Sequence, residues 1–147
     1  MKIALGSDHA GYPLKELLKN YLAGTAMEVE DMGTDSTERV DYPDYAEKVA
    51  LAVRDGKADR GLLVCATGIG IGIAANKVRG IRAAAPWSAE TARLCREHND
   101  ANVLCLAGRY MEPPLALQLL QIWLETPFAG GRHQRRVDKI TALEKHN

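Results

Sequence analysis

The chain has 147 residues, 46% of them hydrophobic, and its nineteen lysines and arginines balance nineteen aspartates and glutamates. This size predicts one domain, residues 1–147, around a single core, and the zero net charge argues against nucleic acid or an anionic membrane as a partner. No apolar run approaches the ~18 residues of a membrane span, and the chain turns polar at residues 7–9, too early for a signal peptide. We therefore expect a cytoplasmic protein.

Short apolar runs alternate with amphipathic segments along the chain, which is typical of βαβ units. The runs predict strands at residues 2–7, 27–31, 61–65, 81–85 and 102–107. Helix starts are indicated between them at Pro13, Pro43–Asp44, Ser88 and Pro113–Pro114. The fold class is therefore α/β, with a five-stranded parallel sheet flanked by helices.

Two segments outside this alternation stand out. The polar connection at residues 33–41 is long, and such loops often carry function. A polar helix is expected from about residue 133 to residue 145, after Gly130 and Gly131. Because no strand follows it, we expect this helix to pack on a partner subunit rather than complete the sheet.

The third strand leads directly into Cys65 and then into the glycine-rich stretch ATGIGIG at residues 66–72. A strand, turn and helix in this order place Cys65 at the carboxyl edge of a parallel sheet, where open α/β folds bind ligands. A helix N-terminus lowers the pKa of a thiol and makes it a better base, and glycines let backbone N–H groups approach an oxyanion or a phosphate. Core packing of Cys65 is about equally compatible with its position.

Other glycine-loop chemistries fit less well. No Gly-Lys-Ser/Thr follows, as a Walker A loop requires, and Ile71 stands where a phosphatase CxxxxxR loop has arginine. The other cysteines, Cys95 and Cys105, lie within an expected helix and strand, so we assign them to the core. Three cysteines without CxxC or metal-type spacing favour free thiols in a reducing compartment.

Polar residues follow or precede several of the expected strands, and we expect them to gather at one rim of the sheet. They are Asp8, His9, Cys65, Thr67, His98, Asn99 and Arg109. Each has a simpler interpretation when taken alone, since Asp8 and His9 can cap a helix and His98 can be a surface residue at a helix end.

Arg132 and Arg136 stand four residues apart, hence on one helical face, with His133 beside them. Two arginine forks so placed can clamp one phosphate. The alternative is a solvated basic helix start, although positive charge there opposes the helix dipole and favours a bound anion.

Six segments of the chain carry a resemblance to one known family: residues 6–11, 40–46, 65–77, 80–83, 96–103 and 131–136. Together they resemble the ribose-5-phosphate isomerase B family over essentially the whole length. The resemblance implies a Rossmann-like three-layer sandwich, a homodimer or a tetramer with active sites at the subunit interface, and no metal or other cofactor. It further implies interconversion of D-ribose 5-phosphate and D-ribulose 5-phosphate, in the pentose phosphate pathway, through ring opening and an enediolate.

The same resemblance implies roles for individual residues. Cys65 would be the base, as in the branch of the family that does not place a glutamate later in the loop, at the position of Ile69 here. The N–H groups of Ala66, Thr67, Gly68, Ile69 and Gly70 would hold the enediolate oxygen.

The remaining roles concern the ring and the two ends of the sugar. His98 would open the ring, with Thr67 and Asp8 assisting. Asn99 and Tyr42 would line the sugar site. The phosphate would be bound by His9, Arg109, Arg132 and Arg136. The partner subunit would supply His98, Asn99 and Arg109.

Two alternatives remain. The first is isomerisation of a six-carbon phosphosugar such as allose 6-phosphate or galactose 6-phosphate, although the latter enzymes divide between two unlike subunits the residues that this chain carries together. The second is a non-catalytic phosphosugar sensor in which Cys65 only packs.

Overall fold

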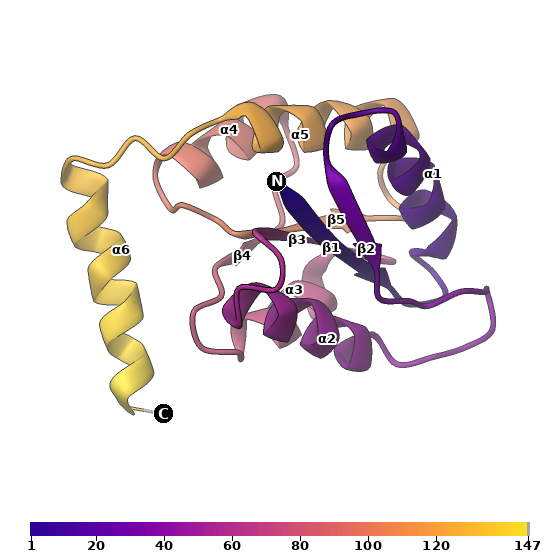
Figure 1. Ribbon diagram of the computed structural model, residues 1–147, viewed down its shortest axis with the longest axis horizontal. Coiled ribbons are helices and arrows are strands. Elements are labelled where there is room, and N and C mark those ends of the chain that lie inside the picture. Colours follow the sequence, from indigo (N-terminus) through magenta and orange to yellow (C-terminus); the bar gives the residue numbers. More distant parts are fainter. Residues whose placement is uncertain (147) are drawn as a thin grey trace.

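Five parallel strands form the centre of the protein in a computed structural model that describes residues 1–146 (Figure 1). Their order across the sheet is β2-β1-β3-β5-β4. The strands are β1 (Lys2–Ser7), β2 (Glu28–Asp31), β3 (Arg60–Cys65), β4 (Ala83–Ala84) and β5 (Val103–Ala107). The predicted parallel sheet is confirmed.

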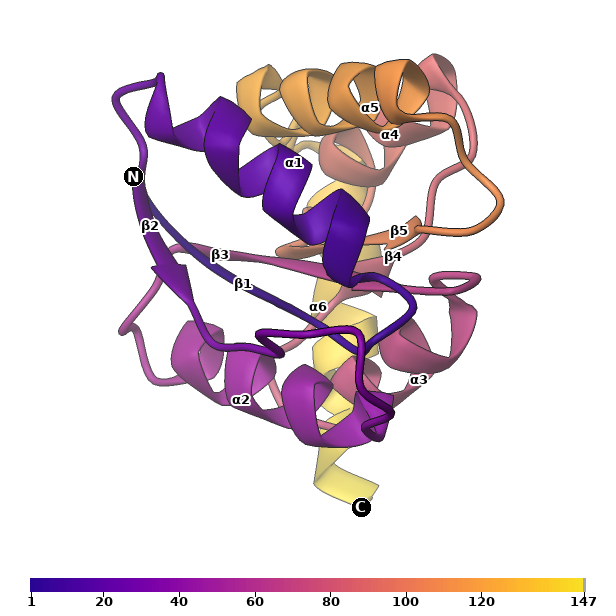
Figure 2. The same ribbon diagram turned by 90° about the vertical axis from the view of Figure 1, so that its right-hand side faces the viewer.

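Helices cover both faces of this sheet, which makes the three layers that the sequence predicted. The helices are α1 (Tyr12–Ala23), α2 (Tyr42–Arg54), α3 (Ile69–Asn76), α4 (Ala89–Glu97), α5 (Pro113–Glu125) and α6 (Arg132–Leu143), followed by the 3₁₀ turn η1 (Glu144–His146). Figure 2 shows α1, α4 and α5 on one face and α2 and α3 on the other. None of the helices in residues 1–146 is long and apolar enough to cross a bilayer.

The helix starts follow the local signals in the sequence. Prolines occupy the first turns of α1, α2 and α5, where a missing N–H costs nothing. Ser88 caps α4: its hydroxyl accepts the N–H of Thr91, and the Thr91 hydroxyl accepts the N–H of Ser88. The expected helix starts are thus confirmed.

The strand β4 is shorter than the five residues predicted for it. It pairs only with β5 and includes only Ala83 and Ala84. Before it, the Arg82 N–H donates to the side chain of Asn102 at 2.8 Å, and beyond it Pro86 has no N–H to give. These two features limit the ladder to two residues.

Side chains of β3 alternate between two hydrophobic cores. Leu62 and Val64 pack with α1, α4 and α5, whereas Leu63 and Cys65 pack with α2 and α3. Cys65 thus faces the glycine-rich helix α3 that follows it.

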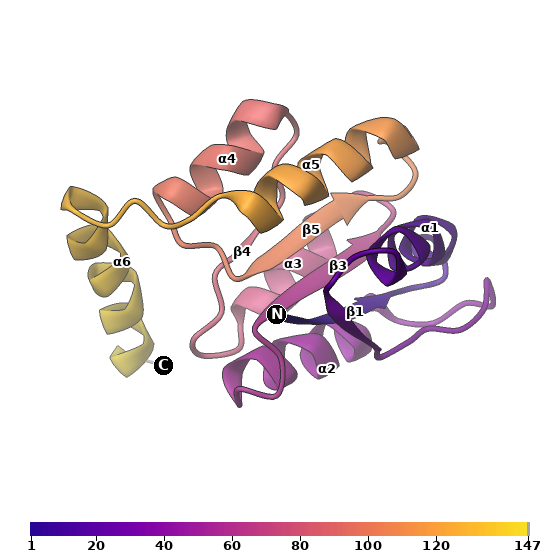
Figure 3. The ribbon, with the colours of Figure 1, turned by 45° about the horizontal axis from the view of Figure 1, so that its top comes forward.

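The last helix, α6, stands at one end of the molecule, beside the sandwich rather than within its layers (Figures 1 and 3). Its buried residues are His133 and Val137. Ile140 and Leu143 are exposed on it, at 42% and 63% of their surface. A helix of this kind has apolar surface left for another contact.

Candidate active site

Cys65 ends β3, and the turn after it holds its sulfur. The N–H of Gly68 donates to Cys65 Sγ at 3.2 Å. Gly68 has φ +75°, and a Cβ there would lie 3.0 Å from the carbonyl carbon of Leu106, so the position requires glycine. Cys65 is buried, with 4% of the residue exposed, and its sulfur lies at the N-terminus of α3.

The three cysteines differ in what their sulfur atoms do. Cys65 accepts a backbone N–H, whereas the Cys95 thiol donates to the carbonyl of Ala92 at 3.2 Å. Burial raises the pKa of Cys95 to about 11 and raises the pKa of Cys105 as well. All three are free. The predicted packing role of Cys95 and Cys105 is confirmed by their place in the two cores.

Asp8 and His9 follow β1 and lie beside the end of β3. The N–H of Asp8 donates to the carbonyl of Val64 at 3.3 Å, which brings Asp8 next to Cys65. Its Oδ1 accepts the N–H of Gly11 at 2.9 Å in the turn before α1, but the N-cap of α1 is Gly11 itself and the helix has no side-chain cap, so Asp8 does not cap it. His9 Nδ1 lies 3.2 Å from both the N and the O of Val40, which fastens the long connection at residues 33–41 to this edge.

Arg109 follows β5 at the same edge. The N–H of Gly108 donates to the carbonyl of Cys65 at 2.8 Å, and the N–H of Arg109 donates to that of Ala66 at 3.1 Å. Arg109 and His9 line one open cavity of about 610 Å³. Arg39 lines it too, a basic residue that the sequence analysis did not single out, although it lies in the connection flagged as functional. Asp41 is the one carboxylate in the lining, and three basic side chains against it suit an anion.

Tyr42 begins α2 and lies against the glycine-rich turn. A Cβ on Gly70 would come within 2.8–3.0 Å of the Tyr42 ring, so glycine lets the ring rest on the start of α3. Thr67 belongs to the same turn, and its hydroxyl accepts the N–H of Ile69 at 3.1 Å. We call Asp8, His9, Tyr42, Cys65, Thr67 and Arg109, with the backbone of residues 66–70, the carboxyl-edge cluster.

His98 and Asn99 do not lie at this edge, and the prediction of a single rim is wrong for them. They follow α4 and precede β5, and a helix that leads into a parallel strand must end at the amino edge of the sheet. The register pairs Gly61 with Val103 at that edge and Cys65 with Ala107 at the other. At about 3.3 Å per residue the two edges lie roughly 13 Å apart.

The resemblance implied that a partner subunit supplies Arg109 together with His98 and Asn99, but within one chain Arg109 lies at the opposite edge of the sheet from these two residues. Arg109 stands at the carboxyl edge with His9 of the same chain. Its position directly after a strand, rather than before one, separates it from the other two.

Two histidines form a contact between the amino edge of the sheet and α6. The rings of His98 and His133 stack, with centroids 4.2 Å apart and planes inclined by 14°. Burial lowers the pKa of His133, and His98 and the two arginines Arg132 and Arg136 lower it further. We call His98, Asn99, Arg132, His133 and Arg136 the amino-edge cluster. His133 was noted in the sequence only as a neighbour of the arginines, because nothing local indicates the stack.

The predicted residues therefore form two groups with different chemistry. The carboxyl-edge cluster offers a thiol, backbone donors and basic side chains around a cavity. The amino-edge cluster offers two imidazoles, an amide and two exposed guanidiniums. Within residues 1–146 no three His, Cys, Asp or Glu side chains gather closely enough to hold a metal ion.

Comparison with known proteins covers nearly the whole chain. The family described as Ribose/Galactose Isomerase matches residues 3–140. Ribose-5-phosphate isomerase B of Escherichia coli is 49% identical over 144 residues, which are 98% of this chain and 97% of that protein. The structure of ribose-5-phosphate isomerase B from Clostridium thermocellum has a TM-score of 0.98 at 52% identity and covers 99% of both chains.

A further structure contains a ligand. Ribose-5-phosphate isomerase B from Mycoplasma genitalium with bound ribulose-5-phosphate has a TM-score of 0.94 at 41% identity. The match covers 99% of this chain and 97% of that one.

Proposed function

The chain belongs to the Ribose/Galactose Isomerase family, and we propose that it is an isomerase that interconverts D-ribose 5-phosphate and D-ribulose 5-phosphate. The observation that carries the proposal is the Cys65 sulfur, held by the Gly68 N–H at a helix N-terminus beside a basic cavity. A relative of the same fold holds ribulose-5-phosphate.

The proposed reaction moves one proton between adjacent carbons. Once the sugar ring is open, the Cys65 thiolate takes the proton from C2, and the electron pair moves to give a 1,2-enediolate with charge on O1. O1 is protonated, O2 loses its proton, and the thiol returns a proton to C1 to give the ketose. No oxidant, reductant or metal is needed to balance these steps.

The backbone of the turn narrows the choice of oxyanion donors. The N–H groups of Gly68 and Ile69 are engaged with Cys65 Sγ and Thr67 Oγ1. The N–H of Gly70 lies in the first turn of α3, where a helix offers it no acceptor of its own. Among the residues 66–70 named from the sequence, we therefore assign the enediolate oxygen to the N–H groups of Ala66, Thr67 and Gly70, of which that of Gly70 lies in the first turn of the helix.

The phosphate and ring-opening groups come from both clusters in this proposal. His9 and Arg109 bind the phosphate from the carboxyl edge, and Arg132 and Arg136 bind it from α6. His98 donates the proton that opens the ring, with Asp8 and Thr67 assisting, and Asn99 and Tyr42 contact the sugar.

A complete site then requires two chains, because the clusters lie at opposite edges of one sheet. We propose a homodimer in which α6 and the amino-edge cluster of one copy close over the carboxyl-edge cluster of the other; two such dimers would give a tetramer. The exposed Ile69 and Ile73 of α3 and the exposed Ile140 and Leu143 of α6 supply apolar surface for this contact. Three free thiols fit the reducing cytoplasm as its location.

The activity is tested with the purified protein in the presence of EDTA. Wild type should convert ribose 5-phosphate to ribulose 5-phosphate, and Cys65→Ala should not. Turnover of allose 6-phosphate is measured in parallel, and its ratio to ribose 5-phosphate turnover tests the six-carbon alternative. Binding of phosphosugar without turnover, unchanged in Cys65→Ala, would instead identify a sensor.

The shared site is tested by mixing two inactive variants. Cys65→Ala and His98→Ala are unfolded together and refolded, so that half of the dimers are mixed. Each mixed dimer has one site with Cys65 of one copy and His98 of the other, so about a quarter of wild-type activity should return. If both clusters served one chain, no activity would return.

A further inference from the structure

The turn between α4 and β5 carries the two predicted sugar contacts of the amino edge, His98 and Asn99, and its backbone is unusual. Asp100 has φ +47° and is the one residue other than glycine with positive φ in residues 1–146. Aspartate tolerates this conformation better than most residues, but it still needs support from its surroundings.

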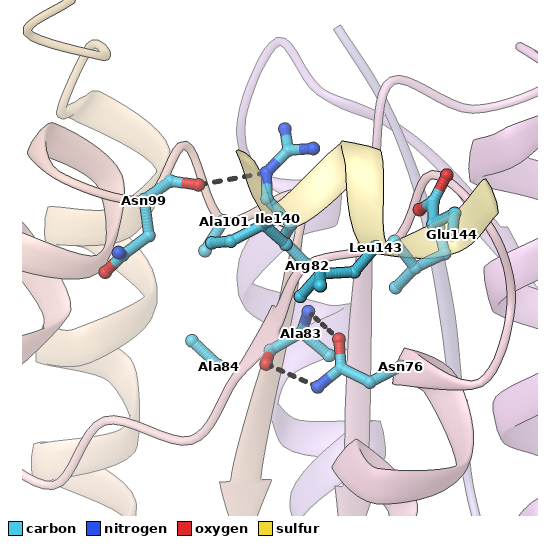
Figure 4. A pocket seen from close by; sticks show the side chains of 10 residues that line it. Asn76, Arg82, Ala83, Ala84, Asn99, Ala101, Ile140, Leu143 and Glu144 are labelled. Atoms are coloured by element: carbon cyan, nitrogen blue, oxygen red, sulfur yellow. Dashed lines mark hydrogen bonds between the residues drawn. The ribbon is translucent and has the colours of Figure 1, made fainter. Parts of the chain in front are cut away.

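Arg82 supplies part of that support from the loop before β4. Its Nε donates to the carbonyl of Asn99 at 2.9 Å, and its Nη2 donates to the carbonyl of Asp100 at 3.0 Å. The same Nη2 lies 3.4 Å from Asp100 Oδ2. Figure 4 shows Nε meeting the Asn99 carbonyl while the Asn99 amide points away from Arg82.

Arg96 holds the turn from the other side. It is 5% exposed, and its Nη1 donates to Asp100 Oδ1 and to the carbonyl of Ala101, both at 2.8 Å. Its Nε donates to the carbonyl of Thr126 at 3.1 Å. Two guanidiniums therefore bind three successive carbonyls and both oxygens of the Asp100 carboxylate.

The loop that carries Arg82 is itself fixed at both ends. The side chain of Asn102 accepts the N–H of Arg82 and donates to the carbonyl of Gly80, each at 2.8 Å. The carboxylate of Glu144 accepts the N–H of Gly80 at 2.6 Å. The loop at residues 80–82 thus joins the turn, through Arg82, to the C-terminal segment, through Gly80.

From these contacts we infer that Arg82, Arg96 and Asp100 are positioning residues for ring opening, which fix the backbone at residues 98–101 so that His98 and Asn99 face the sugar held by a second copy. The inference rests on the proposed function. The polar groups of the three residues hydrogen-bond to the turn and, through Arg96 Nε, to Thr126, so we infer that they act through His98 and Asn99. Small displacements of a proton donor are costly, since about 1 Å of misplacement can cost 10²-fold in rate.

The test uses the fact that ribulose 5-phosphate cannot form a five-membered ring, because its O5 carries the phosphate. Exchange of the C1 hydrogen of ribulose 5-phosphate with D₂O therefore needs Cys65 but no ring opening, whereas turnover of ribose 5-phosphate needs both. Arg82→Met removes the donors and keeps the length of the side chain. The matched control is Arg93→Met, because Arg93 is exposed and pairs with Glu97 at 2.7 Å and with Glu90 at 4.0 Å, both on its own helix α4.

We expect Arg82→Met to lower ribose 5-phosphate turnover by ~10- to 100-fold and to leave C1 exchange within about threefold of wild type. Arg93→Met should change neither. Should Arg82→Met unfold at the assay temperature, Arg82→Lys is measured in its place, since lysine keeps the charge and loses the fork.

Either of two results would overturn the inference while the wild type is active: unchanged ribose turnover in the folded Arg82 variant, or turnover and C1 exchange falling by the same factor. A wild type that fails to convert ribose 5-phosphate would overturn the proposed function itself.

Discussion

The two clusters differ in whether backbone groups or side chains form them. At the carboxyl edge, the proposed groups are backbone N–H donors in a glycine turn and the sulfur of the buried Cys65. At the amino edge, the groups are side chains at the ends of α4 and α6, and Asn99, Arg132 and Arg136 are exposed. One cluster is fixed by the fold of a single chain, and the other depends on how two helix ends meet.

This contrast suggests a division of labour. Stabilising an enediolate requires donors that do not reorganise, which a turn between a buried strand and a helix provides. Ring opening and phosphate binding can use side chains that a partner subunit supplies. The side chains on α6 suit that task. If the two clusters come from different copies, the proposed base Cys65 lacks its proton donor His98 until two chains associate.

The largest expected effect comes from the carboxyl edge. Cys65→Ala removes the proposed base, so ribose turnover and C1 exchange of ribulose 5-phosphate should both fall by ~10³-fold or more. Initial rates and deuterium incorporation measure the two losses. Cys95→Ala is the matched control and should stay active, because Cys95 belongs to the core under α4. Exchange that survives in Cys65→Ala would assign the base to another residue.

A smaller effect, on ribose turnover but not on C1 exchange, is expected at the amino edge. His98→Ala should lower ribose turnover by ~10²-fold and leave C1 exchange nearly intact, because the acyclic ketose needs no ring opening. The ratio of the two rates is the measurement. Equal losses in both would show that His98 serves proton transfer itself, and the division between the clusters would fail.

The glycine turn and the reversed position of His98 show what the sequence could and could not predict. The run at residues 61–65 gave β3 to within one residue, because a strand covered on both faces is apolar throughout. The sheet edge at which His98 lies could also have been predicted, since His98 precedes the expected strand at 102–107 rather than following it. The stack of His98 on His133 could not, because it depends on where α6 lies.

The phosphate contact proposed for the arginines of α6 is expected to affect substrate binding more than the rate of turnover. Arg136→Met should raise the KM for ribose 5-phosphate by ~10-fold with a smaller change in kcat, since a bidentate contact to phosphate acts in both ground and transition states. Arg135→Met is the control one position along the same helix. A fall in kcat at unchanged KM would place Arg136 in the chemistry instead.

The smallest expected effect concerns the pH dependence of the histidine stack. Burial lowers the pKa of His133 below its ordinary 6.5, and His98, Arg132 and Arg136 act in the same direction, against Glu97. The unfolded chain therefore binds a proton at His133 more readily than the folded chain does. The resulting stability is present above pH 6.5 and is lost as the pH falls through the lowered pKa.

His133→Phe separates this contribution from the titration of the carboxylates. Phenylalanine keeps a ring against His98 but carries no proton, so its unfolding temperature should fall less than that of wild type between pH 7.5 and pH 5.5, an interval that brackets the ordinary value of about 6.5. Thermal unfolding of both proteins across this range measures the difference. Parallel curves would mean that His133 titrates as it does in the unfolded chain, and the amino edge would then owe its order to Arg82 and Arg96 rather than to a neutral imidazole against His98.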